Sequence, residues 1–278
     1  MASLWSWFAA PYDAQFMRNA AVAATIVGVL APAVGIWIVQ RRLSYLGDAT
    51  SHATLFGVAG AYLVGQSLAG GALAAGLVMG LLIAILNAHP RLAEDAIIGV
   101  VETAMFALGV ILISRSDRIG VDLSHFLFGQ IATVSNDDLR TNAILAVIAL
   151  SLLFLFFRDL RASTFDPTHA SLVGIRVGAL RYALLALLSI TIVVSLQTVG
   201  LLMSVAMLVT PASAARLASS TMTRMLFVAM GVGIASALGG LTLSYHLASP
   251  SGATIALVAC GMLAVTFAVT VPVRLRRH

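Results

Sequence analysis

Long apolar runs, separated by short polar breaks, follow one another along almost the entire chain. An α-helix needs about 20 predominantly apolar residues to cross the hydrocarbon core of a bilayer. Nine segments come close to this length or exceed it. They are 17–40, 48–66, 70–88, 96–114, 140–157, 182–199, 201–217, 225–246 and 253–273. Gly200 alone separates the sixth segment from the seventh, so the pattern predicts an all-α polytopic membrane protein with eight or nine transmembrane helices.

The composition agrees with a membrane protein and excludes an ordinary soluble domain. Hydrophobic residues make up 60% of the 278 residues and charged residues only 10%, and the mean hydropathy is +1.01. Soluble domains carry about 25% charged residues, because a solvated surface requires them. We therefore expect one compact transmembrane domain over residues 1–278.

Arginine supplies all of the side-chain positive charge, since the chain has 16 arginines and no lysine. A phosphate-binding loop of the G-x-x-x-x-G-K-[ST] type needs a lysine to reach the β- and γ-phosphates of a nucleotide. The sequence therefore predicts that the chain is not an ATPase, and that any ATP is bound by a separate chain. The arginines mark the ends of apolar runs and do not gather on a polar surface, which argues against nucleic acid as a partner.

The distribution of arginine also predicts the orientation, because cytoplasmic loops are enriched in basic residues. With a cytoplasmic C-terminal tail, nine spans place 12 arginines inside and 4 outside. The inside group is Arg41, Arg42, Arg91, Arg158, Arg161, Arg176, Arg181, Arg216, Arg224, Arg274, Arg276 and Arg277, and the outside group is Arg18, Arg115, Arg118 and Arg140. We therefore predict that the N-terminus is outside and the C-terminus in the cytoplasm.

The longest predicted cytoplasmic loop, about residues 158–181, contains the pattern of a short helix. Asp166 is placed to cap the helix, and Pro167 occupies the first helical position, where proline is favoured. Gly174 can end the helix, because many helices end at a residue in the left-handed conformation. Such a helix would offer a rigid handle to a cytoplasmic partner, although an ordinary structured loop explains the same pattern.

Asp48 and His52 are the strongest candidates for chemistry inside a span. Residues at i and i+4 share one helix face with Cβ atoms about 5–6 Å apart, so both side chains can reach one cation. With Arg42 at the cytoplasmic interface, His52 lies about 15 Å further along a helix, near the middle of the hydrocarbon core. The alternative is that Asp48 caps a helix after Gly47 and that His52 bonds a backbone carbonyl.

Two ligands from one chain are too few for a tight metal site. A two-fold homodimer, the commonest oligomer, would supply two carboxylates and two imidazoles. Four nitrogen and oxygen ligands without thiolates suit Zn²⁺ or a similar first-row ion and disfavour Cu(I). We therefore favour zinc over manganese or iron as the ion bound there, and we expect no permanently bound cofactor.

Glu94 and Asp95 lie at the start of their predicted span, where the helix dipole stabilises acidic side chains, and this explains their presence. Glu102 lies too deep in the same span for that explanation. Glu102 could be an additional metal ligand, a proton acceptor or a partner for a neighbouring helix, and the last interpretation is favoured. On the outer side, Asp122 and His125 could gather cations, although a solvated loop explains them more simply.

Eight short motifs occur in order between about residues 40 and 260. They are RLSYLGDATSHA (42–53), EDAIIG (94–99), FALGV (106–110), LFG (127–129), FDP (165–167), QTVGLL (197–202), TPA (210–212) and PSGATI (250–255). Each motif is weak by itself, but the ordered set is specific. It resembles the permease family of zinc, manganese and iron ABC importers, the transmembrane subunits of metal-importing ABC transporters.

The resemblance implies a type II ABC importer fold, similar to the cobalamin permease but with fewer helices, in a prokaryotic cytoplasmic membrane. It implies that two copies of the chain work with two cytoplasmic ATP-binding subunits and an extracytoplasmic metal-binding protein. It further implies that Asp48 and His52 line the translocation path as metal ligands.

The same resemblance implies that the loop from Phe165 to about Arg181 couples the permease to the ATPase. The coupling residues are expected to be Phe165, Asp166, Pro167, Gly174 and Ile175.

The sequence departs from the family pattern at two positions. Phe56 stands where a proline is expected, and Glu102 where a small or apolar residue is expected. Two other functions therefore stay open. One is a proton-coupled secondary metal transporter that uses Glu102 and His52 as a relay, and the other is a membrane scaffold that transports nothing.

Overall fold

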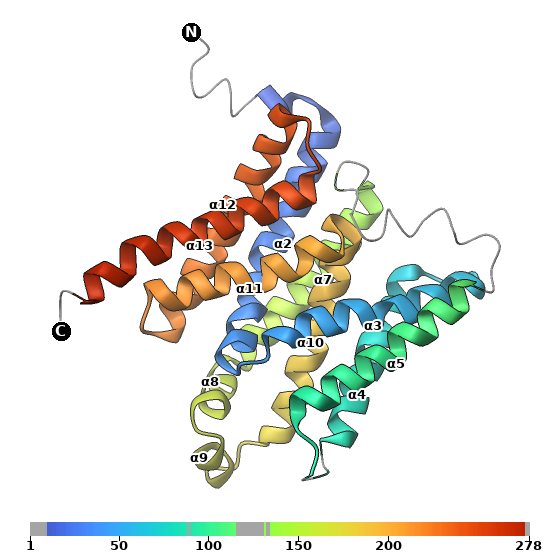
Figure 1. Cartoon of the computed structure of the whole chain (residues 1–278), viewed down its shortest axis with the longest axis vertical. Helices are drawn as coiled ribbons and strands as arrows, with labels where there is room; N and C mark the ends of the chain where they lie inside the picture. Colours follow the sequence, from blue (N-terminus) through green and yellow to red (C-terminus); the bar gives the residue numbers. More distant parts are fainter. Residues whose placement is uncertain (1–9, 88, 90, 115–130, 132–133, 276–278) are drawn as a thin grey trace.

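The computed structural model describes residues 10–87, 89, 91–114, 131 and 134–275, and this part of the chain is helical, without β-strands. Within these described residues, a short 3-10 helix, η1 (Ala10–Asp13), precedes eleven α-helices (Figure 1). The α-helices are α2 (Gln15–Gln40), α3 (Ser44–Leu63), α4 (Leu68–Leu86), α5 (Glu94–Ser114), α7 (Asn136–Leu155), α8 (Phe157–Phe165), α9 (Pro167–Leu172), α10 (Val177–Val199), α11 (Leu201–Ala218), α12 (Met222–Leu247) and α13 (Ser251–Leu275).

The nine predicted segments correspond to the nine long helices, and every observed boundary lies within five residues of its predicted one. The break at Gly200 is confirmed: this residue has φ +79° and separates α10 from α11. Only glycine adopts such a conformation without steric cost. Seven of the described helices are long and apolar enough to cross a membrane. The polar first half of α3 and the short α11 keep those two helices outside this group.

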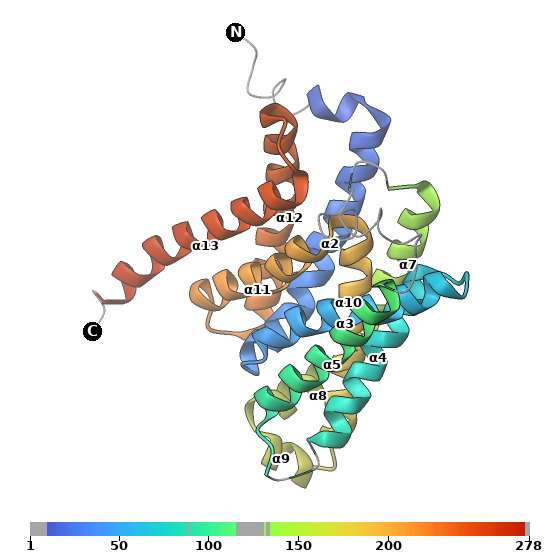
Figure 2. The ribbon, with the colours of Figure 1, turned by 45° about the vertical axis from the view of Figure 1, so that its right-hand side comes forward.

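The core of the molecule lies around α2, which packs against α10, α11 and α12. Figures 1 and 2 place α13 at one edge and α3, α4 and α5 at the opposite edge, with α2 and α10 between them. Glycine allows the central helices to approach closely. A Cβ atom on Gly28 of α2 would lie 2.9 Å from the carbonyl oxygen of Gly233 on α12.

The helices α3, α4 and α5 form a second group, in which α3 packs against both of the others. Gly57 of α3 and Gly71 of α4 mark the closest approach of the first pair. A Cβ atom on Gly57 would lie 2.0 Å from the carbonyl oxygen of Gly71, and a Cβ atom on Gly71 would lie 2.3 Å from that of Gly57. This contact fixes the position of α3, which carries Asp48 and His52.

Candidate metal site and coupling helix

One face of α3 carries three polar side chains in sequence. Tyr45, Asp48 and His52 are spaced by three and four residues, which places them on the same side of the helix. The Oδ1 atom of Asp48 lies 3.7 Å from Nε2 of His52. Since α3 begins at Ser44, Asp48 lies beyond the first turn of the helix. The helix-capping alternative for Asp48 is therefore wrong.

The facing side of α5 contributes Glu102 and Phe106, which are one turn apart. Figures 1 and 2 show α3 and α5 side by side and running in the same direction. The hydroxyl group of Tyr45 donates a hydrogen bond to Oε2 of Glu102. The ring of Phe106 meets the imidazole of His52 edge to face, with 5.5 Å between the ring centroids. The contact with Tyr45 agrees with the favoured interpretation of Glu102 as a partner for a neighbouring helix, and its role as a metal ligand or proton acceptor stays a prediction.

Asp48, His52 and Glu102 form one cluster, in which the candidate ligand atoms all lie within 4.8 Å of one another. His52 lies eight residues after the start of α3, and Glu102 lies eight residues after the start of α5. At a rise of 1.5 Å per residue, both side chains are about 12 Å from the beginnings of their helices. The sequence predicted the pair of Asp48 and His52 but not the approach of Glu102 to it, and Tyr45 was missed.

The charge of the cluster favours a cation. Two carboxylates at this separation repel each other, and an ionised group inside a membrane is costly without a partner. In the part of the chain that the structure describes, neither Asp48 nor Glu102 forms an ion pair with an arginine. Carboxylate oxygen and neutral imidazole nitrogen are both ligands of divalent first-row metals. The side chains of His52 and Asp48 remain 32% and 39% exposed, so a metal ion can reach them.

The predicted cytoplasmic helix exists as α9, and its ends follow the predicted rules. Asp166 accepts a hydrogen bond at 2.8 Å from the backbone N–H of His169, and Pro167 occupies the first helical position. At the other end, Gly174 has φ +86°. The N–H of Ile175 donates to the carbonyl of Ala170 at 3.0 Å, as in a Schellman motif.

The surface around α9 exposes more apolar side chains than the sequence pattern predicted. Phe165 is 62% exposed, and Leu172 and Val173 are 81% and 58% exposed. An open pocket of about 360 Å³ between α8 and α9 adds charged groups, among them Asp159 and Asp166. Leu172 and Val173, two adjacent apolar residues at the end of a short polar helix, were the sequence sign of this exposed surface and were missed.

Arg41, at the turn between α2 and α3, connects the start of the site helix to α8. Its Nε atom donates to Oγ1 of Thr164 at 3.1 Å, and its Nη2 atom donates to Oγ of Ser163 at 3.0 Å. Burial and the nearby charge of Arg181 lower the pKa of the Arg41 guanidinium, and Glu94 acts in the opposite direction. Arg41, Arg181 and Glu94 therefore belong to one group of charges.

Arg181 makes the corresponding connection for α5. Near the start of α10, it forms an ion pair with Glu94, the first residue of α5. In the amide orientation that satisfies both groups, Asn87 at the end of α4 also accepts hydrogen bonds from Arg181. The helix dipole is therefore an incomplete explanation of Glu94, because the sequence could not reveal an ion-pair partner 87 residues away.

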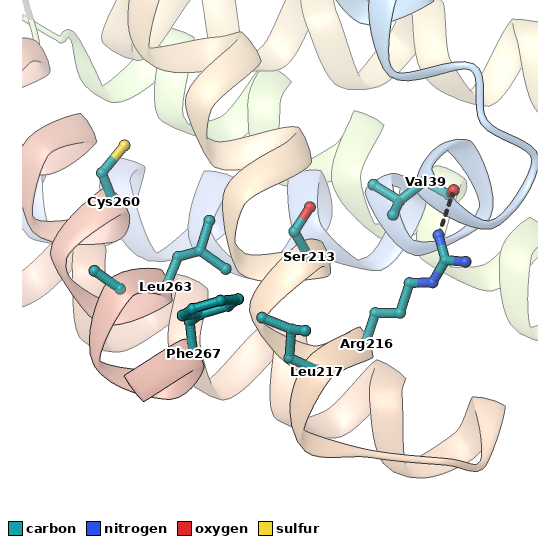
Figure 3. Close-up of a pocket in the computed structure, with 8 residues that line it drawn as sticks. Val39, Ser213, Arg216, Leu217, Cys260, Leu263 and Phe267 are labelled. Atoms are coloured by element: carbon teal, nitrogen blue, oxygen red, sulfur yellow. Dashed lines mark hydrogen bonds between the residues drawn. The ribbon is translucent and has the colours of Figure 1, made fainter. Parts of the chain in front are cut away.

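A second hollow, of about 690 Å³, lies between α11 and α13 (Figure 3). Its wall is mainly apolar and includes Leu263 and Phe267, with Cys260 at one side. On the side of the hollow away from Cys260, the Arg216 guanidinium donates a hydrogen bond to the carbonyl oxygen of Val39 at 3.4 Å. With no carboxylate or imidazole in its lining and with a guanidinium present, this hollow is unsuited to a metal cation. The two outer residues proposed to gather cations, Asp122 and His125, lie outside the described residues.

Comparison with known proteins gives a consistent result along the whole chain. The ABC 3 transport family matches residues 13–270. The "Manganese transport system membrane protein MntC" of Halalkalibacterium halodurans is 39% identical over 96% of this chain and 91% of its own length. A "Probable iron transport system membrane protein" of Haemophilus influenzae is 35% identical over 95% of this chain and 97% of its own length.

A solved structure shows the same architecture. PsaBC from Streptococcus pneumoniae, solved in complex with Fab, superposes with a TM-score of 0.86 and 32% sequence identity, and the match covers 96% of each chain. The type II ABC importer fold expected from the motifs is therefore confirmed. The names of the two sequence relatives described above give manganese and iron. They do not support the expected preference for zinc.

Proposed function

The chain belongs to the ABC 3 transport family, and on this premise we propose that it is the transmembrane permease subunit of an ATP-driven importer of divalent transition metals. The cargo is manganese or iron. The observation that carries the proposal is the pair of Asp48 and His52 on one face of α3, whose Oδ1 and Nε2 atoms lie 3.7 Å apart and whose side chains are partly exposed. The pair lies on α3 beside α5, a helix long and apolar enough to cross a membrane, and this position suits a transient site for a transported ion.

A second copy of the chain completes the path. The cluster remains partly exposed on the α3–α5 side of the protomer, and polar groups at this depth require a partner other than lipid. A two-fold axis beside this face would bring two copies of the cluster together. A metal released by an extracytoplasmic binding protein would then enter between the protomers of this multi-pass protein, with the N-terminus outside and the C-terminus in the cytoplasm.

ATP hydrolysis takes place on two separate cytoplasmic subunits. The support for this step is the absence of lysine from the sequence, together with the exposed apolar surface of the coupling region. Phe165, Leu172 and Val173 provide apolar contacts, while Asp166 and Gly174 hold the ends of α9 rigid. Closure of the ATPase dimer would move α9 and switch access to the cluster from outside to inside.

The test is uptake by the complete transporter in proteoliposomes. With the cognate ATPase subunit and binding protein present, we expect accumulation of Mn²⁺ that depends on ATP and is inhibited by Fe²⁺. A proton-coupled secondary transporter would instead accumulate metal under a proton gradient without the ATPase. A scaffold would accumulate none under either condition. Accumulation driven by the proton gradient alone, or no accumulation at all, contradicts the proposal.

Replacing Leu172 by aspartate should separate the permease from its ATPase. The Leu172 side chain is 81% exposed, so aspartate should not disturb the fold of the permease. In a contact with the ATPase the same side chain would be buried, and a charged carboxylate there would weaken binding. We expect the amount of ATPase that co-purifies with the permease to fall at least about tenfold, which corresponds to about 1.4 kcal/mol of binding free energy.

The matched control for this variant is Leu247→Asp. Leu247 is 64% exposed at the C-terminal end of α12, on the predicted outer side of the protein. This variant should retain its ATPase. Equal recovery of the ATPase with both variants would show that α9 is not the docking element.

A further inference from the structure

Glu102 extends the cluster beyond the two residues that the resemblance assigns to the metal. We propose that Glu102 is a third ligand of the transported ion, that Tyr45 positions it, and that this ligand makes the site selective for Mn²⁺ over Zn²⁺. This inference rests on the proposed function, because it concerns the ion that passes between the two protomers.

Glu102 lies as far along α5 as His52 lies along α3, eight residues after the start of each helix. It reaches the cluster from α5, whereas Asp48 and His52 come from α3, so the three ligands converge from two directions. The spacing of at most 4.8 Å between their ligand atoms allows one ion to contact all three after small side-chain movements. The edge-to-face contact of Phe106 with His52 holds the imidazole in this arrangement.

The hydrogen bond from Tyr45 gives Glu102 a fixed orientation. The Tyr45 hydroxyl group donates to Oε2 of Glu102. The other carboxylate oxygen of Glu102 therefore stays available for the metal. Partners behind metal-binding carboxylates and imidazoles orient the ligand and typically contribute 10–100-fold to metal affinity. Tyr45 is 52% exposed, so its hydroxyl group makes a specific contact and is not simply enclosed by the core.

The number and type of donor atoms decide which metal the site prefers. Asp48 and His52 from two protomers supply two oxygen and two nitrogen donors, a set of four that suits tetrahedral Zn²⁺. Adding Glu102 from each protomer gives four oxygen and two nitrogen donors. A set of six that is rich in carboxylate oxygen suits octahedral ions such as Mn²⁺. Glu102 therefore changes the preferred coordination of the site and not only its affinity.

The test measures metal binding to the purified, nucleotide-free transporter by equilibrium dialysis, separately for Mn²⁺ and Zn²⁺. The variant Glu102→Gln keeps the size of the side chain and its ability to accept from Tyr45, but removes the carboxylate charge. We expect its Mn²⁺ affinity to fall by about 100-fold and that of Tyr45→Phe by about tenfold, while the Zn²⁺ affinity of both variants changes less than about threefold. Unchanged Mn²⁺ affinity, or equal losses for both metals, overturns the inference.

A reference variant separates this inference from the proposed function. Asp48→Asn should weaken the binding of both metals, because it removes a ligand from either coordination geometry. Loss of binding in Asp48→Asn combined with unchanged Mn²⁺ affinity in Glu102→Gln would leave the proposed function intact and remove Glu102 from the site. Unchanged binding in both variants would contradict the proposed metal path itself.

A measurement on the unaltered protein covers the case in which a variant fails to fold. X-ray absorption of the Mn²⁺-loaded transporter reports the number of neighbouring nitrogen and oxygen atoms and the contribution of imidazole. Six neighbours that include two imidazole nitrogens support the proposed ligand set. Four neighbours overturn it.

Discussion

Alanine in place of Asp48 or His52 is expected to lower ATP-dependent Mn²⁺ uptake by about 100-fold or more. Each change removes two ligands from the dimer, and even the loss of a residue that only orients a metal ligand typically costs 10–100-fold in affinity. Uptake in proteoliposomes that contain equal amounts of assembled transporter measures the effect. The basal ATPase rate should persist, since neither residue lies in the coupling region.

Asp95→Ala is the matched control for this pair of variants. Asp95 is an acid at the exposed N-terminal end of α5, so its removal alters the net charge as Asp48→Ala does but leaves the cluster complete. We expect nearly normal uptake. Normal uptake in Asp48→Ala and His52→Ala would refute the metal path, and an equal loss in Asp95→Ala would assign the effect to charge in general.

Among glycine-to-alanine substitutions in α3, α4 and α5, Gly57→Ala should destabilise the protein most. A Cβ atom there would lie 2.0 Å from the backbone oxygen of Gly71, and neither backbone can move without separating α3 from α4. Overpacking a tight interior typically costs about 1–3 kcal/mol and occasionally more. We expect a thermal midpoint in detergent lower by several degrees and a parallel loss of assembled transporter.

Gly60→Ala provides the control on the same helix. Gly60 has no atom within 4 Å of its Cβ position, and alanine favours the helical conformation by about 1 kcal/mol over glycine in exposed positions. This variant should be as stable as the unaltered protein or more stable. If both variants behave alike, the close contact between α3 and α4 does not limit the stability of the protomer.

Much of the fold followed from local chemistry that the sequence displays directly. The length of the apolar runs gave the nine long helices, because each must span a bilayer by itself. The break at Gly200 and the ends of α9 at Asp166 and Gly174 depend on neighbouring residues only. These features were therefore accessible without knowledge of how the helices pack.

The arrangement of the candidate site was only partly accessible, because it depends on residues far apart in the chain. Asp48 and His52 reveal their shared face through a spacing of four residues. Glu102 meets them only because α3 and α5 lie side by side, and no local pattern contains the partnership of Tyr45 with a residue 57 positions away. The preference for zinc rested on a count of four ligands, which did not include Glu102.

The two arginine connections at the N-terminal ends of α3 and α5 have a consequence for how the proposed cargo would leave the site. Arg41 joins the start of α3 to α8, which precedes α9 in the chain. Arg181 joins the start of α5 to α10, which follows α9. A tilt of about 5° at either junction shifts a residue about 12 Å along the helix by about 1 Å. Ligand distances in metal sites lie within about 0.2 Å of their preferred values, so a shift of this size would distort the coordination of an ion held between α3 and α5. Under the proposed function, such a distortion would release the ion without protonation of its ligands.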